Sequence, residues 1–183
     1  MNVVGYSDGA ALLLHLAIDR PELISAMVLV STNFHADAMD PRTFDALEGL
    51  AGDDNMAAQA YAAASPDGPA HWPVVLNKTI ILASTEPVFD PNDLATIDVP
   101  TLVLASDDEL WPTSHTVALY DALPNARLAI LPNTSHLLVF EQPALVAQLI
   151  STFFEHPQRA ETLFPTNRRP ASSDHQGDRV AGC

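Results

Sequence analysis

Apolar segments of two kinds recur along this chain and predict strands and helices in turn. Short, almost uninterrupted apolar runs are typical of strands buried on both faces of a sheet, and they occur at Met1–Val4, Ala26–Ser31, Thr101–Ala105 and Arg127–Leu131. Longer runs with helix-forming residues or helical spacing occur at Ala10–Asp19, Thr113–Leu123 and Ala144–Phe154. The alternating order favours an α/β fold, with a parallel sheet and helical crossovers.

The alternation of strand-like and helix-like apolar runs is less regular between the second and third predicted strands. Ala-rich, acidic stretches at Phe44–Ala51 and Asn55–Ala64 predict helices there, and the segment Ser65–Pro69 predicts a turn. We therefore expect residues 33–96 to form a helical, cap-like insertion within a core of residues 1–155. The stretch 156–183 is polar and rich in Pro, Arg, Ser and Asp, which predicts a disordered tail.

Composition and charge narrow the classes of partner. A chain of 183 residues that is 48% hydrophobic predicts one domain with a substantial core. Its formal net charge of −15 gives no electrostatic basis for binding nucleic acid or anionic membrane lipid. The same charge keeps the protein soluble and favours neutral or cationic small-molecule substrates over anions.

The lone cysteine, Cys183, excludes an internal disulfide and a Cys/His zinc site. The apolar run Ala10–Ile18 is interrupted by His15 and is far shorter than the roughly 20 residues that a membrane span needs. No secretory signal is readable at the start of the sequence. The simplest expectation is a cytoplasmic protein, with no metal and no cofactor.

One pentapeptide carries the candidate chemistry. Gly5-Tyr6-Ser7-Asp8-Gly9 matches the G-x-S-x-G pattern and stands between a predicted strand and a predicted helix, which is the context of a nucleophile elbow. We expect Gly5 and Gly9 to be required because the turn at Ser7 is strained and leaves no room for side chains against the neighbouring strand and helix. The following helix start favours negative charge, and Asp8 would supply a backbone N–H to an oxyanion hole.

A second segment provides the partner of the serine. The strand Arg127–Leu131 runs into Pro132-Asn133-Thr134-Ser135-His136, and Phe140-Glu141-Gln142-Pro143 then opens the last helix. This loop, the elbow and the order serine, acid, histidine together resemble the α/β-hydrolase family over roughly residues 3–155. The resemblance implies Ser7 as the nucleophile and His136 as the general base.

Two residues are candidates for the acid of such a triad. The family places it after the strand Thr101–Ala105, where Ser106-Asp107-Asp108-Glu109 follows. Counting three residues from the strand end, with Ser106 in the place of the family's glycine, selects Glu109. Counting four residues back from Pro112 selects Asp108, which we favour because aspartate is the commoner orienting group. Asp107 is expected to be a solvated neighbour.

The other histidines and aromatic residues have simpler expected roles. We expect His15, on a buried helix, to be a hydrogen-bonded core histidine, and His35 to be an inert loop residue. For His71 and Trp72 in the insertion, packing and substrate contact stay open. The acidic pairs Asp53/Asp54 and Asp37/Asp40 lack a ligand pattern for a metal.

The resemblance implies a hydrolase of small, apolar esters or related acyl compounds that forms an acyl-enzyme. It also raises an alternative, because the family has several strands before its nucleophile and a second oxyanion donor after its third strand. The chain would then be truncated at its N-terminus and weakly active or non-catalytic. Its first strand would be a short, apolar edge through which the chain could self-associate.

Overall fold

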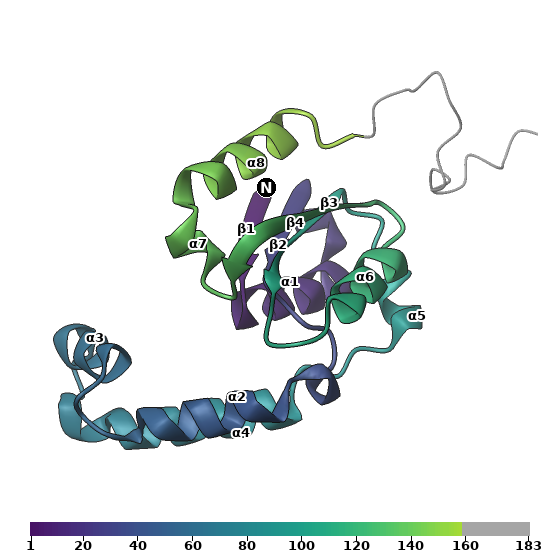
Figure 1. Ribbon diagram of the computed structural model, residues 1–183. Helices are drawn as coiled ribbons and strands as arrows, with labels where there is room; N and C mark the ends of the chain where they lie inside the picture. Colours follow the sequence, from purple (N-terminus) through teal and green to yellow (C-terminus); the bar gives the residue numbers. More distant parts are fainter. Residues whose placement is uncertain (159–183) are drawn as a thin grey trace, which may run out of the picture.

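The computed structural model describes residues 1–158, which fold around a four-stranded parallel sheet (Figure 1). The strands are β1 (Asn2–Tyr6), β2 (Ala26–Val30), β3 (Thr101–Asp108) and β4 (Ala126–Ser135). They lie in the order β1-β2-β3-β4, and every neighbouring pair is parallel. The predicted α/β class with a parallel sheet and helical crossovers is confirmed. The predicted tail lies outside the described residues from position 159 onward.

Helices cover both faces of the sheet. On one face lie α1 (Asp8–Asp19), α5 (Pro91–Leu94) and α6 (Thr113–Ala122), and on the other lie α7 (Leu138–Glu141) and α8 (Pro143–Glu155). Short 3₁₀ turns complete the connections at η1 (Pro21–Leu23), η2 (Ala36–Ala38), η3 (Gly49–Ala51) and η4 (Pro69–His71). The result is three layers, with the sheet in the middle.

The two helical layers explain why the central strands are apolar at every position. Side chains of a strand alternate between the faces of the sheet. Met27 and Leu29 of β2 accordingly pack with α1 and α6, whereas Val28 and Val30 pack with α7 and α8. All of β2 is buried. A polar residue at any of these positions would be left in an apolar layer without a partner, so the sequence contains none.

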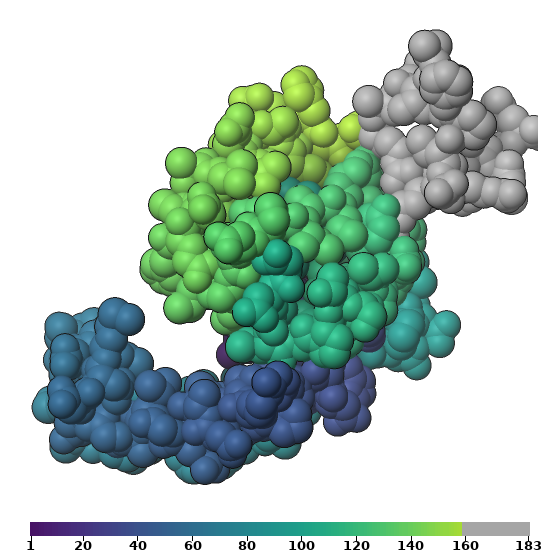
Figure 2. Space-filling model, viewed as in Figure 1, coloured from purple at the N-terminus to yellow at the C-terminus, as the bar shows by residue number. Residues whose placement is uncertain are grey.

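A helical lobe projects from the body between β2 and β3 (Figures 1 and 2). It contains α2 (Pro41–Glu48), α3 (Met56–Ala64) and α4 (Trp72–Thr85). The lobe has a small core of its own around Ala58, Trp72 and Leu76, and the Trp72 indole donates to the Leu50 carbonyl at 2.8 Å. Trp72 is therefore a packing residue of the lobe.

The ends of the predicted insertion belong to the body of the protein. Phe34 at its start, and Phe89 and Leu94 near its end, are buried in the core beneath α1 and α6. The part that projects thus runs from α2 to α4. This boundary is narrower than the predicted span of 33–96, because these apolar residues complete the layer on that face of the sheet.

A histidine fixes the segment that leads into the lobe. The ring of His115 stacks on Phe34 with centroids 4.1 Å apart, and its Nε2 accepts the Phe34 backbone N–H at 3.2 Å. Burial, followed by the nearby His35, lowers the pKa of His115 to about 4. His115 is therefore neutral near pH 7, and its Nε2 stays free of a proton to accept this hydrogen bond.

β1 forms one edge of the sheet among the described residues, with Val4 48% exposed. Self-association through this edge stays a prediction. Among residues 1–158, the helices are all too short or too polar to cross a membrane.

The two glycines of the pentapeptide differ in the space around them. A Cβ on Gly5 would lie 2.5 Å from the Ala10 Cα and from the Gly9 carbonyl oxygen, both of which are backbone atoms of the following helix. A Cβ on Gly9 would meet no described atom within 4 Å. The expectation that both glycines are sterically required is therefore right for Gly5 and wrong for Gly9 within the described structure.

This difference predicts opposite effects for two matched substitutions. Gly5→Ala should lower the free energy of unfolding by about 1–3 kcal/mol or more, because the backbone of α1 must shift. Gly9→Ala should leave it unchanged or raise it by up to ~1 kcal/mol, because alanine favours a helix. Urea unfolding of both variants measures the difference, and equal losses of stability would contradict the steric account.

Candidate active site

Ser7 lies in a strained turn between β1 and α1. Its φ of 54° is in the left-handed region, which non-glycine residues rarely adopt. The Ser7 N–H donates to the Val30 carbonyl at 2.9 Å, and the Ser7 carbonyl accepts from Ala10 at 2.9 Å. These bonds hold the turn between the neighbouring strand and the first turn of the helix. The Ser7 side chain is thereby held at the carboxyl edge of the sheet.

His136 follows β4, which carries a bulge just before it. Leu131 pairs with Ser106, and Ser135 pairs with Asp108, so four steps along β4 match two steps along β3. Asn133 in the bulge has a φ of 56°. Such an insertion bends the strand, and here it precedes the loop that carries His136.

Two exposed carboxylates hold the amides of this bent segment. Asp107 accepts the backbone N–H groups of Asn133 at 2.9 Å and Thr134 at 3.2 Å. Glu141 accepts the backbone N–H of Ser135 at 2.7 Å and its hydroxyl at 2.6 Å. These hydrogen bonds lower the pKa of both carboxyl groups. Asp107 is thus exposed, as expected of a solvated neighbour, and in addition it anchors the loop.

The bent segment brings His136 to Ser7, as the sequence predicts. The Ser7 Oγ lies 3.1 Å from the His136 Nε2, and the His136 Nδ1 lies 2.9 Å from the Glu109 Oε2. The Glu109 side chain is 1% exposed and that of His136 is 16% exposed. A serine, a histidine and a carboxylate therefore form one continuous chain of hydrogen bonds.

The surroundings of Glu109 favour its ionised form. Burial raises its pKa, but hydrogen bonds from His136, from the Ser31 hydroxyl and from the Ser106 backbone N–H together outweigh burial, and the net pKa lies below the usual value. An ionised carboxylate only accepts hydrogen bonds. His136 must then carry a proton on Nδ1, so in the neutral ring Nε2 is free to accept the Ser7 proton.

The structure puts Glu109, and not the favoured Asp108, beside His136. Asp108 is exposed, whereas the carboxylate of Glu109 turns back to accept the Ser106 N–H at 3.1 Å. This return brings the third residue after Ser106 under the imidazole. Counting from the strand end gives the residue whose carboxylate lies beside His136. Counting back from Pro112 fails because Pro112 caps the start of α6, and that helix start does not fix where the acid lies.

Two aromatic side chains that the sequence analysis did not identify enclose His136. The Tyr6 hydroxyl donates to the His136 carbonyl at 2.9 Å, and the Trp111 ring meets the imidazole edge-on at 5.7 Å. Burial, followed by Glu109 and Glu141, raises the pKa of Tyr6, which keeps its hydroxyl protonated as a donor. The position of Tyr6 next to the serine was the one signal in the sequence for such a role.

Asp8 begins α1, as expected for a residue next to the nucleophile. Its backbone N–H has no hydrogen-bond acceptor among the described residues, so it is free to donate to an anion near Ser7. No second backbone donor next to Ser7 can be assigned within residues 1–158.

His15, His35 and His71 make no hydrogen bond to Ser7, His136 or Glu109 in the described structure. His15 is exposed and packs against Phe89 with ring centroids 4.4 Å apart, so the expectation of a core histidine is wrong. The helix is buried on one face, and His15 lies on the other. His35 accepts the Asp37 N–H at 3.3 Å, and His71 ends the turn η4. The described residues contain no group of three metal-ligating side chains.

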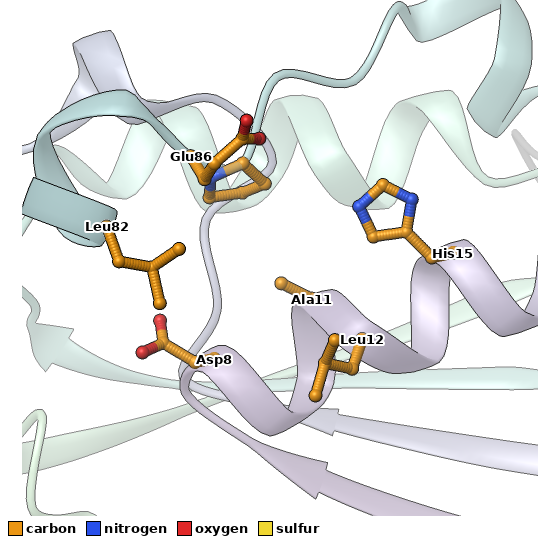
Figure 3. A pocket seen from close by; sticks show the side chains of 7 residues that line it. Asp8, Ala11, Leu12, His15, Leu82 and Glu86 are labelled. Atoms are coloured by element: carbon orange, nitrogen blue, oxygen red, sulfur yellow. The ribbon is translucent and has the colours of Figure 1, made fainter. Parts of the chain in front are cut away.

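A largely apolar cavity of about 320 Å³ opens beside Asp8 (Figure 3). Side chains from α1 face the end of α4 across it, and its lining consists of Asp8, Ala11, Leu12, His15, Leu82, Glu86 and Pro87. The cavity joins the start of α1, next to Ser7, to the end of the lobe. An apolar group bound there would lie close to the candidate oxyanion donor.

Comparisons with known proteins agree on one family. Residues 2–149 match the sequence profile of the alpha/beta hydrolase family. A protein of Caulobacter sp. (strain K31), named "Putative carbamate hydrolase RutD", is 33% identical over 156 residues, covering 74% of this chain and 58% of that protein. A protein of the same name from Variovorax paradoxus (strain S110) is 28% identical, with the same coverage. The chain thus spans a little over half the length of these relatives.

Solved structures show the same fold. MGS-M2, an alpha/beta hydrolase enzyme from a Medee basin deep-sea metagenome library, superimposes with a TM-score of 0.64 at 24% identity. The match covers 89% of this chain and 67% of that one.

The geometry predicts which carboxylate matters. Glu109→Gln should slow the reaction of Ser7 with a fluorophosphonate by on the order of 10⁴-fold, because an amide can stabilise the wrong imidazole tautomer. Asp108→Asn should change the rate by less than about twofold, since an exposed carboxylate without contact to His136 has little influence on it. Quenching the labelling reaction at a series of times measures both rates. A larger loss of rate in Asp108→Asn than in Glu109→Gln would identify Asp108 as the acid.

Proposed function

The chain belongs to the alpha/beta hydrolase family, and we propose that it is a serine hydrolase of small, neutral acyl compounds. The observation that carries this proposal is the hydrogen-bond chain from Ser7 through His136 to Glu109. A serine hydroxyl is a weak nucleophile unless a base removes its proton. The three side chains supply that base and hold it in the required tautomer.

The reaction proceeds in two halves. Ser7 Oγ attacks the substrate carbonyl carbon while its proton passes to His136 Nε2, and the negative charge on the carbonyl oxygen is stabilised by the Asp8 N–H. The tetrahedral intermediate then loses its leaving group, which takes the proton from His136. A water molecule then attacks the acyl-enzyme and gives a proton to the same Nε2. When this second tetrahedral intermediate collapses, Ser7 Oγ leaves and takes that proton back from His136, and the acid is released. Glu109 stays ionised and stabilises the imidazolium each time it forms.

The surroundings of the site favour neutral or apolar substrates. Asp8, Asp107 and Asp108 lie near the proposed reaction centre, and the whole chain has a net charge of −15. Acidic groups repel anionic substrates. The apolar cavity beside Asp8 supports binding of an apolar substituent (Figure 3). The lobe of α2, α3 and α4 would act as a cap over this side of the site.

A carbamate is a second candidate substrate class beside a carboxylic ester. The relatives in Caulobacter and Variovorax are named for carbamate hydrolysis. A neutral carbamate presents the same kind of carbonyl to Ser7 as an ester, with nitrogen in place of the carbon that is bonded to the carbonyl group. The triad chemistry is identical for both, so the choice between them depends on the groups that the cavity accepts.

We expect a fluorophosphonate to label the chain at Ser7. Ser7→Ala should abolish labelling and hydrolysis while leaving thermal unfolding nearly unchanged, because the nucleophile is lost and the turn is kept. Ser114→Ala, an exposed serine on α6, is the matched control and should be labelled like the wild type. Mass spectrometry of the labelled peptide locates the modified residue. Labelling that persists in Ser7→Ala would overturn the proposal.

A panel of chromogenic substrates, measured with the same protein, identifies the substrate class. Chromogenic esters of increasing acyl length should be hydrolysed in preference to anionic esters of equal size, and neutral aryl carbamates test the second class. Turnover that depends on Ser7 supports a working enzyme. Labelling without measurable turnover of any compound would favour the weakly active alternative.

A further inference from the structure

Ser31 lies directly after β2 and is fully buried, although it is polar. Its φ of 46° is in the left-handed region, which is unfavourable for a residue with a Cβ. Its backbone N–H donates to the Leu104 carbonyl of β3 at 2.8 Å, so the sheet itself holds this conformation. Unfavourable backbone conformations that the surrounding structure maintains are concentrated at functional sites.

The hydroxyl of Ser31 meets the carboxylate that faces His136. Ser31 Oγ donates to Glu109 Oε1 at 2.5 Å, and the Ser106 N–H donates to the same oxygen at 3.1 Å. The other oxygen, Oε2, is left for His136 at 2.9 Å. The carboxylate thus has one oxygen held by the protein and one oxygen presented to the imidazole.

This division fixes the orientation of the carboxyl group. The terminal torsion of a glutamate is broad and has no sharp rotamer of its own. The hydrogen bond from the Ser106 N–H alone, at 3.1 Å, would still allow the carboxylate to rotate. A second donor to the same oxygen, from a different strand, restricts that rotation. Ser31 approaches from β2 and Ser106 from β3, so together they hold Oε1 from two sides.

We propose that Ser31 is a positioning residue for catalysis, whose hydroxyl aims Glu109 Oε2 at His136 Nδ1. The inference rests on the proposed serine hydrolase function. Ser31 does not touch the substrate or the reacting atoms, and acts through Glu109 and His136. It adds a fourth side chain to the hydrogen-bond chain, supplied by the one strand that contributes no member of the triad.

Loss of the hydroxyl has two consequences that a purely structural residue would not produce. The carboxylate gains rotational freedom, which lowers the fraction of molecules with a productive His136. The pKa of Glu109 also rises, because a donor to its charged form is gone. The acid limb of the pH–rate profile should then move to higher pH. The other titratable or charged groups that face this region are His136, Tyr6, Asp40, Arg42, Asp107 and Asp108.

Three substitutions separate this role from stability. Ser31→Ala removes the hydroxyl and keeps the unfavourable φ, whereas Ser31→Gly removes the hydroxyl and also relieves the backbone. Ser31→Thr restores a hydroxyl on a β-branched side chain, which a positive φ disfavours. We expect Ser31→Gly to be at least as stable as Ser31→Ala yet equally slow, and Ser31→Thr to be less stable yet faster than either.

The experiment measures kcat, KM and the labelling rate of Ser7 from about pH 3.5, where the wild-type chain stays folded, to pH 9. Ser31→Gly and Ser31→Ala should lower kcat by about 10- to 100-fold, the size expected for one charge-assisted hydrogen bond, with KM within about twofold. Thr32→Val is the matched control, because the buried Thr32 hydroxyl donates to the Asn33 carbonyl at 3.1 Å and not to Glu109. Its rate and pH profile should equal those of the wild type.

The outcomes distinguish this inference from the proposed function. If the wild-type chain is not labelled at Ser7, the proposed function fails, and this inference fails with it. If the wild type is labelled and Ser31→Gly reacts at the same rate with an unshifted acid limb, the positioning role alone is overturned. A loss in Ser31→Gly that Ser31→Thr partly restores supports it, whether or not Ser31→Ala folds well.

Discussion

The parallel pairing of four neighbouring strands is the constraint on which the site depends. Because the strands point the same way, the residues that follow them emerge at one edge, and these are Ser7, Ser31, Glu109 and His136. β4 lies three strand spacings from β1, about 14 Å at the usual separation. A bulge bends a strand, and the bulge in β4 comes just before His136, whose Nε2 lies 3.1 Å from Ser7 Oγ. The bend thus helps the segment after β4 to cross the edge of the sheet.

Three carboxylates near this edge have different roles because their surroundings differ. Asp107 and Glu141 are exposed and hold backbone amides of the bent segment, so they fix where the imidazole lies. Glu109 is buried and accepts from His136, so it determines which nitrogen of the ring carries the proton. The loop geometry and the tautomer are thus set by separate acidic groups. Tyr6 adds a further hydrogen bond to the His136 carbonyl, from the residue next to the nucleophile.

Local patterns in the sequence predicted the strands, the three long helices of the body (α1, α6 and α8), the serine and the histidine. Patterns of this kind depend on neighbours in the chain, and the contacts that were missed do not. Helix α4 was missed because its many β-branched residues, such as Val74 and Ile80, are also typical of strands. The sequence favours Asp108 over Glu109 because the return of the Glu109 side chain to Ser106 leaves no periodic signal. Ser31 follows a strand like any polar residue, and only the pairing of β2 with β3 explains its role.

The tautomer of His136 tests this account most directly. The account requires a proton on Nδ1, shared with Glu109, and an unprotonated Nε2 facing Ser7. Nitrogen-15 NMR of the imidazole at neutral pH distinguishes the two nitrogens, with His136→Gln used to assign the signals. We expect Nδ1 to show the shift of a protonated nitrogen and Nε2 that of a free one. A proton on Nε2 in the neutral ring would contradict the account, because that nitrogen could not then accept the proton of Ser7.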